Sequence, residues 1–223
     1  MTLSTELKSG TKKSHSAAEN TKFVASFLRG VVDPEEYRKL IANFYFVYRA
    51  MEQEIGKNPI GAVIDDPVLY RTNALEKDLE YYYGSNWRTI ITQTPACIKY
   101  VERIHEIADS NEPYLLVGHH YTRYIGDLSG GQILKGIAEK TLPDLPEGEG
   151  LHFYDFDEIK DAKAYKNEYR YTLDAIDLDQ SQIDAIISEA NYAFKLNMYM
   201  FDEIQGSARK SLWTLLVNWI KGK

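Results

Sequence analysis

Four residues near the N-terminus combine imidazole, ammonium and carboxylate groups at helical spacing. Lys8, Lys12, His15 and Glu19 follow one another at intervals of four, three and four, which aligns them on one helix face. Neutral imidazole can bind iron, and ammonium groups can pair with carboxylates at a ligand's edge. The pattern fits an anionic, iron-containing planar ligand. The competing interpretation is a solvated lysine-rich face with a histidine that binds nothing.

A second candidate site lies in residues 121–132, which read Tyr-Thr-Arg-Tyr-Ile-Gly-Asp-Leu-Ser-Gly-Gly-Gln. Apolar residues before and after this run recur at helical spacing. Yet Gly126, Gly130 and Gly131 each cost about 1 kcal/mol relative to alanine in a helix interior. Such a sequence indicates a kinked helix whose backbone lies close to a flat ligand. The turn-forming residues of the run equally allow an ordinary loop between two helices.

A helix through this run would place a carboxylate beside a surface without side chains. One face would carry Arg123, Gly126 and Gly130, and the next would carry Tyr124, Asp127 and Gly131.

This run resembles the distal-helix signature of the haem oxygenases. The segment from Leu7 to Asn20 resembles the proximal helix of the same family, and residues 165–170 and 194–201 resemble two later elements. The resemblance spans roughly residues 3–205. It implies that His15 ligates haem iron and that Glu19 holds the other ring nitrogen. Gly118-His119-His120 departs from the family pattern, and neither histidine is expected to be the axial ligand.

The resemblance also implies the remaining site residues. A clamp for the haem propionates is implied at Lys8, Lys12, Tyr121, Lys166 and Arg170. A distal catalytic set is implied at Tyr48, Arg123, Gly126, Asp127, Gly130 and Asn197. Pocket walls and close haem contacts are implied at Gly126, Gly130, Gly131, Phe194 and Phe201. Phe194, Asn197 and Phe201 share one helix face because they recur at i, i+3 and i+7.

The implied reaction is the oxidative opening of haem by O2, giving biliverdin, CO and ferrous iron, at the α-meso carbon. Haem is both substrate and cofactor, so the protein supplies binding, orientation and electrostatics. Asp127 is expected to hold a water that delivers a proton. The implied electron donor is reduced ferredoxin or a flavoprotein reductase, and a bilin reductase of phycobilin biosynthesis is a further expected partner.

Composition predicts a soluble globular protein. The 223 residues are 44% hydrophobic and 26% charged, and the net charge of −7 argues against nucleic acid as a partner. The single cysteine, Cys97, favours a reducing compartment and a buried structural role. No signal peptide is expected, and the apolar stretch at 212–220 is about half as long as a spanning helix. The expected location is the cytoplasm, or the plastid stroma of an alga.

Nearly continuous helical periodicity predicts one all-α domain over residues 1–223, a helical bundle with haem between the first helix and the glycine-kinked helix. The predicted helices cover residues 4–28, 34–56, 67–83, a short piece around 87, 95–110, a central segment after 113, 158–176, 181–204 and a short tail helix within 206–223.

Two alternatives come from other functional classes. Glu102-x-x-His105 and Glu149-x-x-His152 match the ligand pairs of di-iron carboxylate oxidases, but the second pair lies in a stretch rich in proline and glycine. A haem carrier or sensor would use His15 without turnover. Asp127 and the glycines argue against it, because storage needs no proton-delivering carboxylate.

Overall fold

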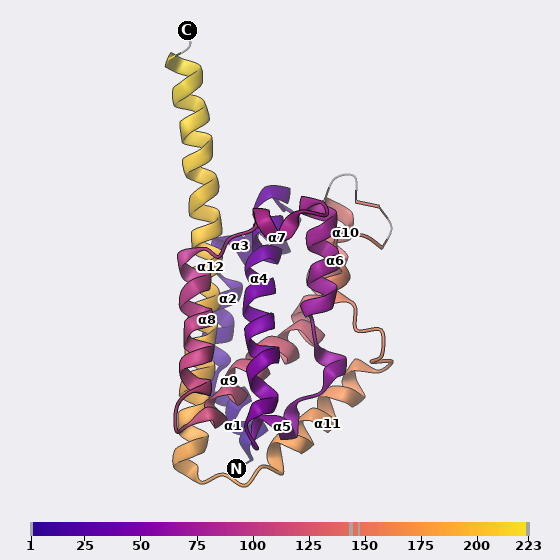
Figure 1. Cartoon of the computed structure of the whole chain (residues 1–223), viewed down its shortest axis with the longest axis vertical. Helices are drawn as coiled ribbons and strands as arrows, with labels where there is room; N and C mark the ends of the chain where they lie inside the picture. Colours follow the sequence, from indigo (N-terminus) through magenta and orange to yellow (C-terminus); the bar gives the residue numbers. More distant parts are fainter. Residues whose placement is uncertain (1, 143–144, 147, 222–223) are drawn as a thin grey trace.

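The protein is built from helices joined by turns and loops (Figure 1). The computed structural model describes the backbone of residues 2–142, 145–146 and 148–221, and side chains as far as Gln205; this part contains no β-strand. The α-helices are α1 (Leu3–Gly10), α2 (Lys12–Glu19), α3 (Lys22–Leu28), α4 (Pro34–Glu54), α5 (Gly61–Ile64), α6 (Thr72–Tyr83), α7 (Trp87–Ile90), α8 (Pro95–Ala108), α9 (Leu116–His120), α10 (Gln132–Thr141), α11 (Ala162–Asp174) and α12 (Gln180–Lys221). The shorter turns are η1 (Ile55–Lys57), η2 (Pro67–Leu69), η3 (Pro113–Leu115), η4 (Tyr121–Ile125), η5 (Asp127–Gly131) and η6 (His152–Tyr154).

Helix α4 is the central helix of the bundle and packs against α6, α8 and α12. It begins where predicted, because the Asp33 side chain accepts hydrogen bonds from the backbone N–H groups of Glu35 and Glu36. Much of the helix is buried, including Ile41, Val47 and Met51. Burying large apolar side chains stabilises such a helix far more than its intrinsic propensity does.

The predicted first helix over residues 4–28 is wrong, because the segment is three helices, α1 to α3. The Thr11 hydroxyl donates to the Leu7 carbonyl at 2.7 Å where α1 ends, and Thr21 caps α3 by accepting from Val24 N–H. Side-chain bonds of this kind compete with a continuous helix. Gly10 allows α1 to approach α12, because a Cβ there would lie 2.6 Å from Ile187 Cγ2.

Residues 113–141 are helical from end to end, so the loop interpretation of the glycine-rich run is wrong. The run η3, α9, η4, η5 and α10 is continuous, with π-helical turns at η4 and η5. A Cβ on Gly118 would lie 2.9 Å from backbone atoms of Ala190 and Ile186, which shows how closely α9 crosses α12. This contact anchors the N-terminal side of the glycine-rich run.

The C-terminal prediction of two helices is also wrong, because α12 is a single helix from Gln180 to Lys221. Figure 1 shows its last part extending past the other helices. The predicted helix at 67–83 is instead a 3-10 turn, η2, followed by α6. The helix predicted from 158 begins at Ala162, where Asp161 caps it. Within the described residues, no helix is long and apolar enough to cross a membrane.

Candidate active site

We call residues 121–132 the distal segment. Its two π turns, η4 and η5, widen the helix near Gly126, Gly130 and Gly131. A Cβ built on Gly126 or on Gly130 would meet no atom within 4 Å. A Cβ on Gly131 would lie 3.6 Å from Asp127 Cβ and 3.6 Å from a ring carbon of Tyr154. Two of the three glycines therefore border open space, while the third packs against the protein. π turns of this kind often occur at functional sites.

Asp127 projects from the second π turn into a buried polar network. The Tyr48 hydroxyl of α4 donates to one carboxylate oxygen of Asp127, and Arg123 Nη2 lies 3.5 Å from the other. Arg123 also donates to the Tyr48 hydroxyl at 2.8 Å and to the Asn197 side-chain oxygen at 2.6 Å. Arg123 and Asp127, which the sequence places on two adjacent faces of one helix, are therefore in contact.

The network extends to Tyr100, which sequence reasoning did not single out. Asn197 Nδ2 lies 3.5 Å from the Tyr100 hydroxyl, and Tyr100 itself is fully buried on α8. Nothing in the sequence distinguishes Tyr100 from the other 16 of the chain's 17 tyrosines. Its role follows only from the way in which α8 and α12 pack against each other.

Burial and charge together set the ionisation of this network. Burial raises the pKa of the Asp127 carboxyl, while the charge of Arg123 and the hydrogen bond from Tyr48 act in the opposite direction. Burial also raises the pKa of Tyr48 well above its ordinary value. Burial alone would lower the pKa of Arg123, but Tyr48 and Asp127 outweigh it and the pKa is raised. A permanent cation therefore lies beside a carboxyl group that burial makes easier to protonate.

His15 and Glu19 lie on α2, near the N-terminus. His15 Nδ1 lies 3.6 Å from Glu19 Oε1, and both side chains are more than half exposed, at 58% and 55%. The His15 ring contacts the edge of Phe194 on α12 at a centroid distance of 5.8 Å. Nε2 of His15 has no hydrogen-bond partner in the described part of the chain. One ring nitrogen is thus directed to Glu19 while the other is available to a ligand.

The predicted clamp residues divide between two regions. Lys166 on α11 donates to the Leu128 carbonyl at 3.2 Å and to the Ser129 hydroxyl at 3.0 Å, so it reaches the second π turn. The charge of Arg170 acts on the half-buried Tyr121, where burial raises the phenol pKa and Arg170 lowers it. Lys166 therefore contacts the second π turn, and Arg170 acts electrostatically on Tyr121 in the first.

Lys8 and Lys12 lie on the other region, with exposed side chains at the end of α1 and the start of α2. The break at Thr11 places them on two helices, so the single face predicted for Lys8 and His15 is not formed by one helix. Helix α1 packs against α11, where the backbone N–H and hydroxyl of Ser4 bond the Asp174 carboxylate at 2.7 and 2.9 Å. The helices that carry Lys8 and Arg170 are therefore neighbours.

Phe194 and Phe201 share α12 but have different surroundings. Phe194 is half-buried beside His15, whereas Phe201 is buried and stacks on Phe23 of α3 with centroids 5.5 Å apart. Asn197, between them in sequence, bonds Arg123. The face predicted from their spacing therefore contacts His15 at Phe194, Arg123 at Asn197 and the core at Phe201.

The heme oxygenase family model matches residues 1–203 of the chain. The chain belongs to the haem oxygenase family. It is 50% identical over 224 residues to Heme oxygenase 1 of Nostoc sp., covering 99% of this chain and 93% of that protein. It is 52% identical over 223 residues to Heme oxygenase of Pyropia yezoensis, again covering 99% and 93%. The family and the enzyme class expected from the sequence are confirmed.

Two solved haem oxygenases of Synechocystis sp. share the fold. The heme oxygenase-1 structure in complex with heme has a TM-score of 0.90 and 47% identity, and the match covers 99% of this chain and 100% of that chain. The heme oxygenase-2 structure in complex with heme and NO has a TM-score of 0.91 and 43% identity, with 95% and 88% covered. The all-α haem oxygenase fold predicted from the sequence is therefore confirmed.

The two histidines before the distal run of this haem oxygenase are fully buried and have other partners. His119 Nε2 lies 2.9 Å from Glu189 Oε1, and His120 Nδ1 lies 2.7 Å from the Tyr169 hydroxyl. Burial lowers the pKa of His120 to about 3, so this imidazole is neutral at physiological pH. Neither ring is exposed to an incoming ligand.

The di-iron alternative finds no support in the structure. His105 Nδ1 lies 3.2 Å from Glu54, and His152 Nδ1 lies 3.0 Å from Asp78, so the two Glu-x-x-His pairs have separate surroundings. Among the residues that the structure describes, no group of three or more His, Cys, Asp or Glu side chains could hold a metal ion. Cys97 is buried, and its burial raises the thiol pKa to about 12, as expected of a structural cysteine.

Proposed function

We propose that this haem oxygenase binds haem between α2 and the distal π turns and opens it to biliverdin, CO and ferrous iron. The observation that carries the proposal is the position of Asp127, which is fixed by Tyr48 and Arg123 next to two glycines that border open space. A flat ligand on that surface would lie against backbone and within reach of a buried carboxyl group. A protein that only stored haem would gain nothing from that group.

The residues present fit haem. Gly126 and Gly130 leave room for a planar group, and His15 has one ring nitrogen directed to Glu19 and the other available. Lys166 and Arg170 supply cations at the edge of the distal segment. Bound haem would supply the iron that activates O2 and the ring that is oxidised.

On the proximal side, His15 would hold the iron and Glu19 would orient the imidazole. A carboxylate near Nδ1 favours the tautomer that has its proton on that nitrogen, which leaves Nε2 as the ligating atom. Phe194 limits rotation of the ring through its edge contact. These contacts set the direction from which His15 approaches its ligand.

On the distal side, Asp127 would hold a water and pass a proton to the reacting oxygen. Burial raises the carboxyl pKa, which favours the protonated form, while the charge of Arg123 and the hydrogen bond from Tyr48 favour the ionised form. A carboxyl group balanced in this way can both give and regain a proton. Asn197 and Tyr100 would hold Arg123 in place through the bonds already described.

The orientation of the ring would come from the propionate clamp, formed by Lys8, Lys12, Tyr121, Lys166 and Arg170. Their amines, guanidinium and phenol can bind two carboxylates and so set the rotation of the ring. Together with the glycine surface and with Gly131, Phe194 and Phe201, the clamp would direct attack to the α-meso carbon.

Electrons would come from reduced ferredoxin, with a flavoprotein reductase as the other candidate. An acidic ferredoxin would dock on the lysines around the clamp despite the net charge of −7. A bilin reductase would take the product, in the cytoplasm or in a plastid stroma. Relatives of cyanobacterial and algal origin support this setting.

The experiment is an optical titration with hemin, followed by reductant and catalase under air. We expect one hemin to bind per chain, and then a biliverdin spectrum and released CO to replace the haem absorption. A stable haem complex that never opens the ring would leave a carrier or sensor. Absence of haem binding would contradict the whole proposal.

A further inference from the structure

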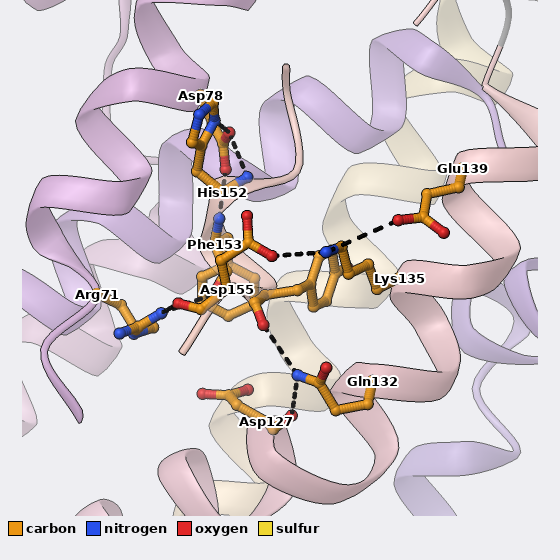
Figure 2. Close-up of polar contacts among 10 residues, drawn as sticks. Arg71, Asp78, Asp127, Gln132, Lys135, Glu139, His152, Phe153 and Asp155 are labelled. Carbon is orange, nitrogen blue, oxygen red and sulfur yellow. Dashed lines mark hydrogen bonds and ion pairs between the residues drawn. The ribbon is translucent and has the colours of Figure 1, made fainter. Parts of the chain in front are cut away.

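A short segment lies against the distal helix at Gly131 and Gln132. We call residues 152–155 the strap; Figure 2 shows it between α6 and α10. The Asp78 carboxylate of α6 accepts hydrogen bonds from the backbone N–H groups of His152 and Phe153, each at 2.8 Å. Asp78 is fully buried, so its charge is used to hold the strap backbone.

Arg71 holds the strap from the same side. Its guanidinium donates to the carbonyl oxygens of Phe153, at 3.4 Å, and Asp155. It also lies 3.7 Å above the centre of the Phe156 ring. Because Arg71 and Asp78 are both buried charges bound to backbone groups, the strap is fixed relative to α6.

The other side of the strap contacts the distal helix through Gln132. The two N–H bonds of the Gln132 amide are directed to the Tyr154 carbonyl at 2.9 Å and to the Asp127 carbonyl at 3.4 Å. Figure 2 shows Gln132 between the strap and Asp127. One turn further along, Lys135 forms an ion pair with Asp155 at 2.6 Å. The backbone of the residue whose carboxylate enters the active site is thus tied to the strap.

Packing brings the strap and the second π turn together as well. The Tyr154 ring is 3.6 Å from the position of a Cβ on Gly131, so this glycine borders the strap, whereas Gly126 and Gly130 border open space. The carboxylate of Asp127 is fixed by Tyr48 and Arg123, and its carbonyl is fixed by Gln132. Both ends of the residue are therefore held.

We propose that Gln132 is a positioning residue for ring opening. By donating to the Asp127 and Tyr154 carbonyls, it holds the second π turn against the strap and so sets the height of Asp127 and Gly130 above the ligand. This role rests on the proposed function, but the tie between helix and strap does not. Gln132 is exposed, so replacing it creates no cavity in the core.

The test is hydrogen exchange of the full-length, haem-free protein, measured for the wild type and for Gln132→Leu, Gln132→Glu and Gln132→Lys. Leucine and ionised glutamate cannot donate, whereas lysine keeps donors on a flexible chain. We expect amides in 126–132 and in 152–155 to exchange about fivefold faster in the first two variants. Lysine should recover much of the protection, and α8 amides should not change. Ile133→Ala, at an adjacent exposed position, is the control.

A role through helix propensity alone would make leucine as good as lysine, because both favour helices. Unchanged exchange in the leucine variant, or equal loss of protection in the leucine and lysine variants, would overturn the proposal.

A second measurement uses hemin and reductant. Gln132→Leu should bind hemin within about twofold of the wild type but yield a broader mixture of biliverdin isomers. An unchanged isomer ratio would also overturn the role in ring opening, and failure of the wild type to make biliverdin would contradict only the proposed function.

Discussion

The hydroxyl of Tyr48 on α4 donates to the carboxylate of Asp127 on the second π turn. This bond joins the central helix of the bundle to the glycine-rich distal helix. Tyr48 is fully buried and Asp127 is nearly so. Because Arg123 lies at the other carboxylate oxygen, Asp127 has one well-defined orientation beside the open glycine surface.

The role of Asp127 can be tested with Asp127→Asn. Asparagine keeps an acceptor for Tyr48 but cannot deliver a proton, so we expect the rate of biliverdin formation to fall by about 100-fold or more. Hemin binding, measured by optical titration, should change by less than about twofold, because Asp127 is not a ligand. Asp202→Asn, at an exposed position on α12, is the control. An unchanged biliverdin rate would remove Asp127 from the mechanism.

We expect alanine at Gly126 or Gly130 to stabilise the haem-free protein but to weaken hemin binding. Gly126→Ala and Gly130→Ala place a methyl group in open space, so each should stabilise the haem-free protein by about 0.5–1 kcal/mol in urea unfolding. The same methyl group would occupy the ligand's place, so hemin affinity and turnover should fall. Gly136→Ala is a matched control on α10, where a Cβ also meets nothing within 4 Å. If Gly136→Ala weakens hemin binding as much as the other two, the ligand does not lie on the predicted surface.

The axial ligand is tested with His15→Ala. We expect a changed spectrum of the hemin complex and an affinity lower by at least about tenfold, with imidazole in the buffer restoring the original spectrum. Glu19→Gln should have a smaller effect, because both side chains are exposed and 3.6 Å apart. His105→Ala, at a half-buried histidine of α8 that pairs with Glu54, is the control. A hemin spectrum that is the same in His15→Ala and in the wild type would exclude His15 as the ligand.

The helices with strong terminal signals were predictable from sequence. Asp33-Pro34 and Thr94-Pro95 begin α4 and α8 where expected, because each capping side chain accepts a backbone hydrogen bond. The break at Thr11 was missed, since one threonine hydroxyl bonded to Leu7 outweighs an amphipathic pattern that runs on through residue 28. The continuity of α12 through Gly206 was missed for the opposite reason, because a glycine can lie within a helix.

The candidate site was predictable where local spacing or family resemblance applied. Asp127 and its glycines form one local motif, and His15 precedes Glu19 by one helical turn. Tyr100, Arg71 and the strap were not predictable, because they reach the distal helix only through contacts between helices far apart in sequence. Periodicity reports which face of a helix is apolar, but it does not report which buried tyrosine meets which arginine.

Because His120 is buried, we expect the free energy of unfolding to depend on pH. Burial holds its pKa at about 3, below the ordinary value of 6.5. Between these two values the unfolded chain binds a proton that the folded chain does not, so stability falls as the pH falls below 6.5, by about 1.4 kcal/mol per unit. His120→Gln removes the titration and keeps a polar partner for Tyr169. Urea unfolding of the haem-free protein at pH 7.5, 6.5 and 5.5 should show a shallower acid loss in this variant.

For that comparison the slope matters more than the stability at any one pH, because His120→Gln also changes packing. Ile133→Ala, at an exposed position that carries no titratable group, should keep the slope of the wild type. Equal slopes for His120→Gln and the wild type between pH 6.5 and 5.5 would show that His120 is protonated in the folded protein. The buried environment described for it would then be incorrect.

The stoichiometry of a single turnover shows most directly whether this protein opens the haem ring. The protein is loaded with one equivalent of hemin, and reductant and catalase are added under air. CO, biliverdin and ferrous iron are then quantified. We predict close to one equivalent of each per chain from the wild type, and a small fraction of that from Asp127→Asn at equal hemin loading. Hemin that is bound but yields neither CO nor biliverdin would show that the protein holds haem without opening the ring.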